Sequence, residues 1–217
     1  MQAIELNNPT DNNLTLIIVF AIVLIAVLKL LNSNELSEYT IAFFNLGFFQ
    51  KKSDTAFNLF TPFQFILTVF SCIVLSLIFY TCFQNFIFYQ NDFTGFLKIF
   101  TFVFCYLFFR YFLDIIIVSI LAIKKSISYF LHIKYGYLFS LCLLVFPAVI
   151  INIYSLKGTV FLLSVFIVLL VFRMLLILFN NKKLLVSKLF YFILYLCALE
   201  IAPLLILYKI LYKTTIT

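Results

Sequence analysis

Four charged residues lie inside long apolar stretches of this chain, where the pattern predicts membrane-spanning helices. They are Arg110, Asp114, Arg173 and Glu200, and they include both arginines of the 217-residue sequence. On insertion scales a charge near the bilayer centre costs about 2.5 to 3.5 kcal/mol, so four unpaired charges would cost roughly 10 to 14 kcal/mol. We therefore expect these four residues to pair with one another inside the protein.

Depth within the bilayer suggests which residues pair. Arg110 and Asp114 are four residues apart and share one face of a helix. At 1.5 Å per residue, Asp114 lies about 6 Å deeper than Arg110 and near the level of Arg173, whereas Glu200 lies near the level of Arg110. We hypothesise cross-helix links from Asp114 to Arg173 and from Glu200 to Arg110. Arginine suits this role because its planar fork can bond two carboxylates and it stays protonated when buried.

Such a charged network has three interpretations. We favour a polar staple that orients the helix bundle, because carboxylates held beside fixed cations are poor proton carriers. The alternatives are a docking site for a larger complex and a pathway for an ion or substrate. Pro203, three residues after Glu200, would free backbone carbonyls near that charge, which slightly favours a pathway.

Catalytic and metal-binding arrangements are not indicated. Asp114 and Glu200 could form a carboxylate pair, but no predicted span contains a histidine to act with them. The lone His132 has no second histidine or cysteine pair nearby, so we expect a solvated residue rather than a metal ligand. No nucleotide-binding loop or protease motif occurs. We expect no enzymatic activity, no cofactor and no soluble small-molecule substrate.

The composition is that of an integral membrane protein. Hydrophobic residues make up 65% of the chain, against about 45–50% in ordinary soluble domains. The net charge of +7 comes from lysines beside the apolar stretches, which is typical of membrane anchoring. Nucleic-acid binding is not expected, because no basic stripe lies on a soluble element. The five cysteines are scattered, so we predict no disulfide framework.

We predict an all-α fold, a polytopic transmembrane helix bundle that forms a single domain over residues 1–217. The expected spans are residues 14–31, 62–83, 96–123, 135–154, 159–179 and 184–212. The first span ends at Asn32–Asn34, and Thr61-Pro62 is a favourable start for the second. Kinks are predicted at Pro147 and Pro203. Lys124, Lys125, His132 and Lys134 are assigned to a basic connector between the third and fourth spans.

Residues 35–54 are too interrupted to span a bilayer. A helix with Leu36, Tyr39, Phe43 and Leu46 on one side would lie in the interface, with lysines near the lipid headgroups. A folded loop packed on the bundle is an equally good interpretation. The residues that we expect to anchor the protein at the interface are Lys51, Lys52, Lys124, Lys125, Lys182 and Lys183.

The lysines also predict the orientation. With the N-terminus outside the cytoplasm, nine lysines lie on the inner side (Lys29, Lys51, Lys52, Lys124, Lys125, Lys134, Lys182, Lys183 and Lys188) and four on the outer side (Lys98, Lys157, Lys209 and Lys213). We therefore expect both termini outside, and a retained first span. A re-entrant sixth span, broken at Pro203, would instead return the C-terminus to the inside.

One stretch resembles a known family. Residues 195–205 read YLCALEIAPLL and are followed by Tyr208 and Lys209. This pattern is similar to the end of a family of small bacterial inner-membrane proteins known only as a domain of unknown function, as are the length and hydropathy profile. The resemblance implies a single polytopic domain in a bacterial inner membrane, with no activity attached to it.

These observations lead to a functional expectation. We predict an accessory or structural subunit of a larger inner-membrane complex, in protein-export or cell-envelope machinery, with other integral membrane proteins as partners. The N-terminus is expected in the periplasm. The alternative is a small transporter or channel that uses the four intramembrane charges as its polar path.

Overall fold

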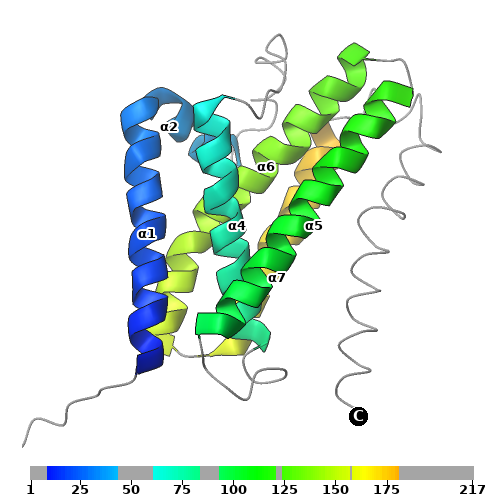
Figure 1. The fold of residues 1–217 in the computed structure, drawn as a ribbon. Coiled ribbons are helices and arrows are strands. Elements are labelled where there is room, and N and C mark those ends of the chain that lie inside the picture. Colours follow the sequence, from blue (N-terminus) through cyan, green and yellow to red (C-terminus); the bar gives the residue numbers. More distant parts are fainter. Residues whose placement is uncertain (1–8, 44–60, 84–92, 121–123, 157, 181–217) are drawn as a thin grey trace, which may run out of the picture.

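The computed structural model describes residues 9–43, 61–83, 93–120, 124–156 and 158–180, and they form helices and short links without strands. The helices are α1 (Pro9–Leu31), α2 (Ser33–Ala42), α4 (Pro62–Phe83), α5 (Phe93–Ile120), α6 (Lys124–Ile151) and α7 (Thr159–Asn180), with a π-helical turn, η1 (Asn152–Leu156), between the last two. This arrangement confirms the predicted all-α bundle (Figure 1).

Five of these helices are long and apolar enough to cross a membrane. Their apolar segments are Asn13–Leu31, Pro62–Thr81, Phe93–Asp114, Ile133–Ser155 and Val160–Ile177. They correspond to the first five predicted spans. The sixth, residues 184–212, lies outside the described part of the chain, together with Glu200, Pro203, Lys51, Lys52, Lys182 and Lys183.

The core lies between α4 and α6. Of the α4 span 67% is buried, against 11% of the α5 span, and Figure 1 shows α4 between α1 and α5, with α6 crossing obliquely behind it. Small residues bring α4 and α6 close together: Cys142 Sγ lies 4.0 Å from the carbonyl oxygen of Ser71. Beside this contact the rings of Phe70 and Phe146 meet edge to face at 5.4 Å. Close approach of small residues is the usual basis of helix packing in a bilayer, where apolar burial alone gives little.

The predicted ends of the first and second spans are confirmed. α1 ends at Leu31, and the side chain of Asn32 caps α2 by accepting a hydrogen bond from the Glu35 amide at 3.4 Å. α4 begins at Pro62, and the Thr61 carbonyl accepts the amide of Phe65 at 3.0 Å. The Asn32 side chain thus caps α2, and Pro62 occupies the first position of α4, where its missing amide hydrogen costs nothing.

α2 is a short helix that packs against the bundle. It occupies the first part of the predicted interfacial segment, so both interpretations of that segment were partly right: the chain is helical there, and it rests on other helices. Its inward side carries Tyr39 and Phe43, which are buried, with Leu36 partly buried beside them. Leu46 and the rest of the segment lie outside the described residues.

α6 begins earlier than predicted. The segment 124–134, expected as a connector, forms the first turns of α6, and α5 ends at Ile120. Lysine, serine and isoleucine are compatible with a helix, and this segment has no glycine or proline to stop one. Pro147 lies inside α6, and the helical repeat widens to the π-helical turn directly after this helix.

Candidate functional site

Three buried charged residues meet where α5 ends, α6 begins and α7 ends. Asp114 is 1% exposed, Lys134 2% and Arg173 4%. On α5, the helical repeat places Asp114 on the same side as the buried residues Phe96 and Val103, which lie 18 and 11 residues earlier. A buried side of this peripheral helix therefore carries a carboxylate.

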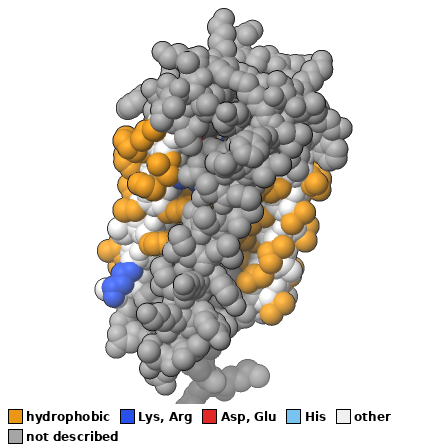
Figure 2. Space-filling model, turned by 90° about the vertical axis from the view of Figure 1, so that its right-hand side faces the viewer, with side chains coloured by type: hydrophobic (Ala, Val, Ile, Leu, Met, Phe, Trp, Pro, Cys, Tyr) orange, Lys and Arg blue, Asp and Glu red, His pale blue; other side chains and the backbone are white. Residues whose placement is uncertain are grey.

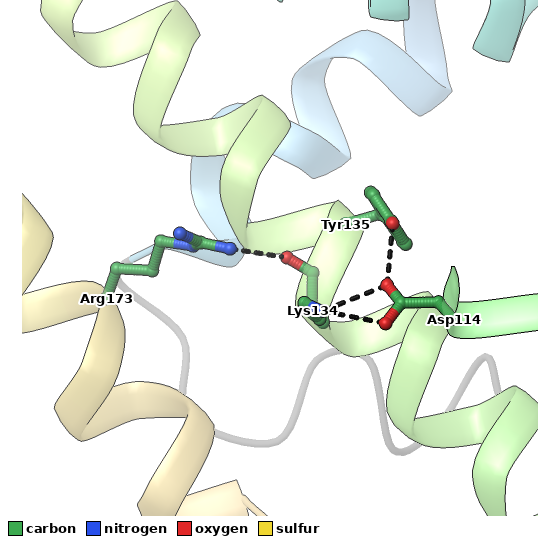
Figure 3. Close-up of polar contacts among 4 residues, drawn as sticks. All are labelled: Asp114, Lys134, Tyr135 and Arg173. Atoms are coloured by element: carbon green, nitrogen blue, oxygen red, sulfur yellow. Dashed lines mark hydrogen bonds and ion pairs between the residues drawn. The ribbon is translucent and has the colours of Figure 1, made fainter. Parts of the chain in front are cut away.

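Asp114 forms an ion pair with Lys134. The Lys134 ammonium donates to both carboxylate oxygens, at 2.9 Å to Oδ2 and 3.2 Å to Oδ1 (Figure 3). The Tyr135 hydroxyl also donates to Oδ2, at 2.7 Å. Hydrogen bonds to an ionised group are short and strong, and they are what makes a buried charge tolerable. Two consecutive residues of α6 thus hold one carboxylate of α5.

Aromatic rings surround the ion pair. The Lys134 ammonium lies 5.7 Å from the centroid of the Tyr135 ring, within range of a cation–π interaction. Tyr111, one turn before Asp114 on α5, meets Tyr135 edge to face at 5.8 Å. The contact with Tyr111 helps to hold the Tyr135 ring in place beside the carboxylate.

Arg173 brings the third helix into the cluster. Its Nη2 atom donates to the backbone carbonyl oxygen of Lys134 at 3.2 Å (Figure 3). The structure therefore connects Asp114 and Arg173 by way of Lys134, whereas the hypothesis from depth had them in direct contact. The hypothesis also placed Asp114 and Arg173 at a similar depth along the bundle, and the contacts of both residues with Lys134 agree with it. We name Asp114, Lys134, Tyr135 and Arg173 the polar cluster.

The polar cluster lies towards one end of the bundle rather than at its middle. Asp114 is the last residue of the α5 apolar segment, Lys134 the second of the α6 segment, and Arg173 is four residues from the end of the α7 segment. From the helix ends on that side these positions are about 9 to 15 Å away at 1.5 Å per residue. The insertion cost of roughly 10 to 14 kcal/mol, estimated for four unpaired charges at the bilayer centre, is thus an upper limit.

Of the two remaining residues of the predicted network, the structure describes Arg110 but not Glu200. Arg110 lies one turn before Asp114 on α5 and is half-buried, so the two residues share a helix face as their spacing predicted. Glu200 lies outside the described residues. Its link to Arg110 stays a prediction.

Sequence reasoning missed Lys134 and Tyr135. Only residues 121–123 separate α5 from α6, and helices joined so tightly are antiparallel neighbours. Asp114 lies six residues before the end of α5 and Lys134 ten residues after the start of α6, which brings them within about one turn of the same level. Assigning Lys134 to a connector concealed this signal.

Three other predicted positions lie in α6. Lys124 and Lys125 begin α6, and Pro147 is exposed on it. Within the described ranges, no three His, Cys, Asp or Glu residues are grouped so that they could hold a metal ion. What the arrangement does chemically is to neutralise one carboxylate and to tie α5, α6 and α7 together.

Comparison with protein families identifies a match over most of the chain. The family model matches residues 14–211, and its description is Domain of unknown function (DUF4271). No curated protein and no solved structure matches the chain.

Proposed function

Because this chain belongs to the DUF4271 family, whose description names no activity, we propose its role from the geometry: a non-enzymatic accessory or structural subunit of a larger membrane complex. The proposed setting is protein-export or cell-envelope machinery in a bacterial inner membrane, with the N-terminus in the periplasm. The bacterial setting is supported by the resemblance of residues 195–205, and the orientation by the lysines.

The observation that carries the proposal is that both oxygens of the Asp114 carboxylate are hydrogen-bonded to side chains of α6. Three hydrogen bonds from Lys134 and Tyr135 occupy its two oxygens. A carboxylate that serves an ion or substrate needs a free coordination position, whereas one that fastens helices needs its oxygens occupied. The Asp114 geometry supports fastening, and with it a structural role.

The surface of α5 supports a partner helix. Its exposed large side chains are mostly aromatic, namely Phe93, Leu97, Phe102, Phe104, Phe108, Phe109, Phe112 and Ile116. Phe96, Phe100, Phe104 and Phe108 stack in series, with centroids 6.2, 6.3 and 6.5 Å apart. Hydrophobic side chains dominate the described surface that is visible in Figure 2. A rigid aromatic row offers a neighbouring transmembrane helix extensive van der Waals contact.

The test is a gentle extraction of the full tagged chain, followed by mass spectrometry of the proteins that co-purify. A subunit should retain a partner in fixed stoichiometry, and Phe104→Leu with Phe108→Leu should weaken that retention. Phe20→Leu on the exposed side of α1 is the matched control and should leave it unchanged. Recovery of the chain alone, as a monomer or homo-oligomer, would refute the subunit proposal.

One observation favours the runner-up, a small transporter or channel. The cation that pairs with Asp114 is a lysine, which exchanges its proton far more readily than an arginine. Proteoliposomes with an internal pH-sensitive dye would test this role. Proton movement that is present in the unmodified protein and lost in Lys134→Arg would establish transport, and equal traces from empty liposomes and both proteins would exclude it.

A further inference from the structure

We propose that α2 is a latch that holds α6 and α7 together beside the polar cluster, with Tyr39 and Phe43 as its positioning residues. α2 is only 10 residues long, a length at which an isolated helix is marginal in water. Its position therefore depends on what it packs against. Its inward residues Tyr39, Ala42 and Phe43 are buried.

Tyr39 fixes α2 to the centre of the bundle. Its ring stacks on Phe63 of α4 at 6.1 Å and meets Phe139 of α6 edge to face at 6.3 Å. A hydrogen bond with Gln64 of α4 holds the phenol. Burial, with a smaller effect from Glu35, raises the pKa of Tyr39, so its hydroxyl stays neutral.

The main chain of α2 is tied to α6 as well. Tyr39 lies in the last turn of α2, where carbonyl groups lack partners within the helix. The Ser140 hydroxyl of α6 donates to the Tyr39 carbonyl oxygen at 2.6 Å. Both groups are buried, so loss of this bond would leave an unsatisfied acceptor among apolar side chains.

Phe43, directly after α2, contacts α7. Its ring lies 5.1 Å from that of Phe172, the residue before Arg173. α2 and Phe43 thus touch α6 at Phe139 and Ser140, on the residues that follow Lys134, and touch α7 next to Arg173. In Figure 3 the pale blue ribbon of α2 passes beside the hydrogen bond from Arg173 Nη2 to Lys134. A displacement of α2 would therefore loosen α6 and α7 on the side where α2 rests on them.

The latch does not depend on whether the protein is a subunit or a transporter. In the subunit, a partner that moves α2 would loosen the polar cluster. In a transporter, the same movement would open it. The polar side of α2, with Asn34 and Ser37 exposed, is the side that such a partner could reach.

Hydrogen exchange with mass spectrometry on the full chain in lipid nanodiscs tests the latch. Ser140→Ala should raise exchange about tenfold or more in residues 133–140 and 170–177, because it removes the partner of a buried carbonyl. Tyr39→Ala should do the same more strongly. Ile41→Ala, which alters an exposed side chain of the same helix, should change neither segment.

A second arm separates the latch from general destabilisation. In an Arg173→Gln background the contact that α2 positions is already lost, so Ser140→Ala should have a much smaller effect on residues 170–177. Faster exchange confined to α2, or an undiminished effect in that background, would overturn the proposal.

Discussion

Asp114 shows how this protein keeps a carboxylate inside an apolar bundle. Its partners Lys134 and Tyr135 are adjacent in sequence, so one turn of α6 supplies both the counter-charge and the neutral donor. Burying a charge is tolerated only when its remaining lone pairs are also satisfied. The neutral Tyr135 hydroxyl therefore helps to solvate the carboxylate that Lys134 neutralises.

Replacing Tyr135 with phenylalanine tests whether its hydroxyl stabilises the buried Asp114 carboxylate. Tyr135→Phe removes the 2.7 Å hydrogen bond to the carboxylate and should lower the free energy of unfolding by about 1.5–3 kcal/mol. Tyr154→Phe is the control, because its exposed hydroxyl bonds the neutral Thr15 hydroxyl and should cost no more than about 1 kcal/mol. Denaturant titration in mixed micelles measures both. Equal losses would show that the carboxylate does not need the phenol.

The sequence predicts half of the polar cluster. Asp114 and Arg173 stand out in the sequence because a charge inside a predicted span is costly unless it is paired. Lys134 and Tyr135 do not stand out, because lysine and tyrosine are common at the edges of spans, where they anchor helices at the interface. Only the packing of α5 on α6 distinguishes a buried lysine from an anchoring one.

At the scale of elements, α6 makes polar contacts with three other helices. It supplies Lys134 and Tyr135 to α5, the Lys134 carbonyl to α7 and the Ser140 hydroxyl to α2. Gly136 and Ser140 are buried and lie four residues apart on one face, which leaves room for a neighbouring backbone. Small residues on this face are thus a requirement of the packing.

Enlarging Gly136 should disrupt that packing. Gly136→Leu inserts a large side chain where none fits and should destabilise the protein by about 1–3 kcal/mol or more. Ser164→Leu on the exposed side of α7 makes a comparable change facing lipid and should stay within about 0.5 kcal/mol. Thermal unfolding in nanodiscs compares them. A neutral Gly136→Leu would mean that this face of α6 is loosely packed.

The helices themselves were largely predictable. Apolar length defines five spans, and the Asn32 and Pro62 signals mark helix ends where the structure has them. The start of α6 was wrong by 11 residues, because polarity ends a span without ending a helix. Whether α2 would pack on the bundle was open, since that depends on partners far away in sequence such as Ser140.

At the scale of the whole molecule, the polar cluster gathers the charges at one end of the bundle, the end where α1 passes into α2. Lys134 is buried there, so it no longer belongs among the flanking lysines that predict orientation. The remaining lysines stand at eight against four, which still favours the predicted orientation. The helices thus present apolar side chains at the periphery of the bundle, and the polar cluster connects three of them, α5, α6 and α7.

A double-mutant cycle tests whether the ion pair between Asp114 and Lys134 stabilises the fold. Asp114→Asn or Lys134→Met alone leaves an uncompensated buried charge or polar group and should cost about 3–5 kcal/mol of unfolding free energy. The double variant removes both charges and should cost less than the sum by about 2–3 kcal/mol. Lys98→Gln, exposed on α5, is the control for α5 and should be neutral.

This cycle, measured by denaturant titration in mixed micelles, addresses the central claim directly. A coupling of that size between Asp114 and Lys134 is the result that we predict. Losses that add to within about 0.5 kcal/mol would show that the two residues act independently, and would contradict the fastening role.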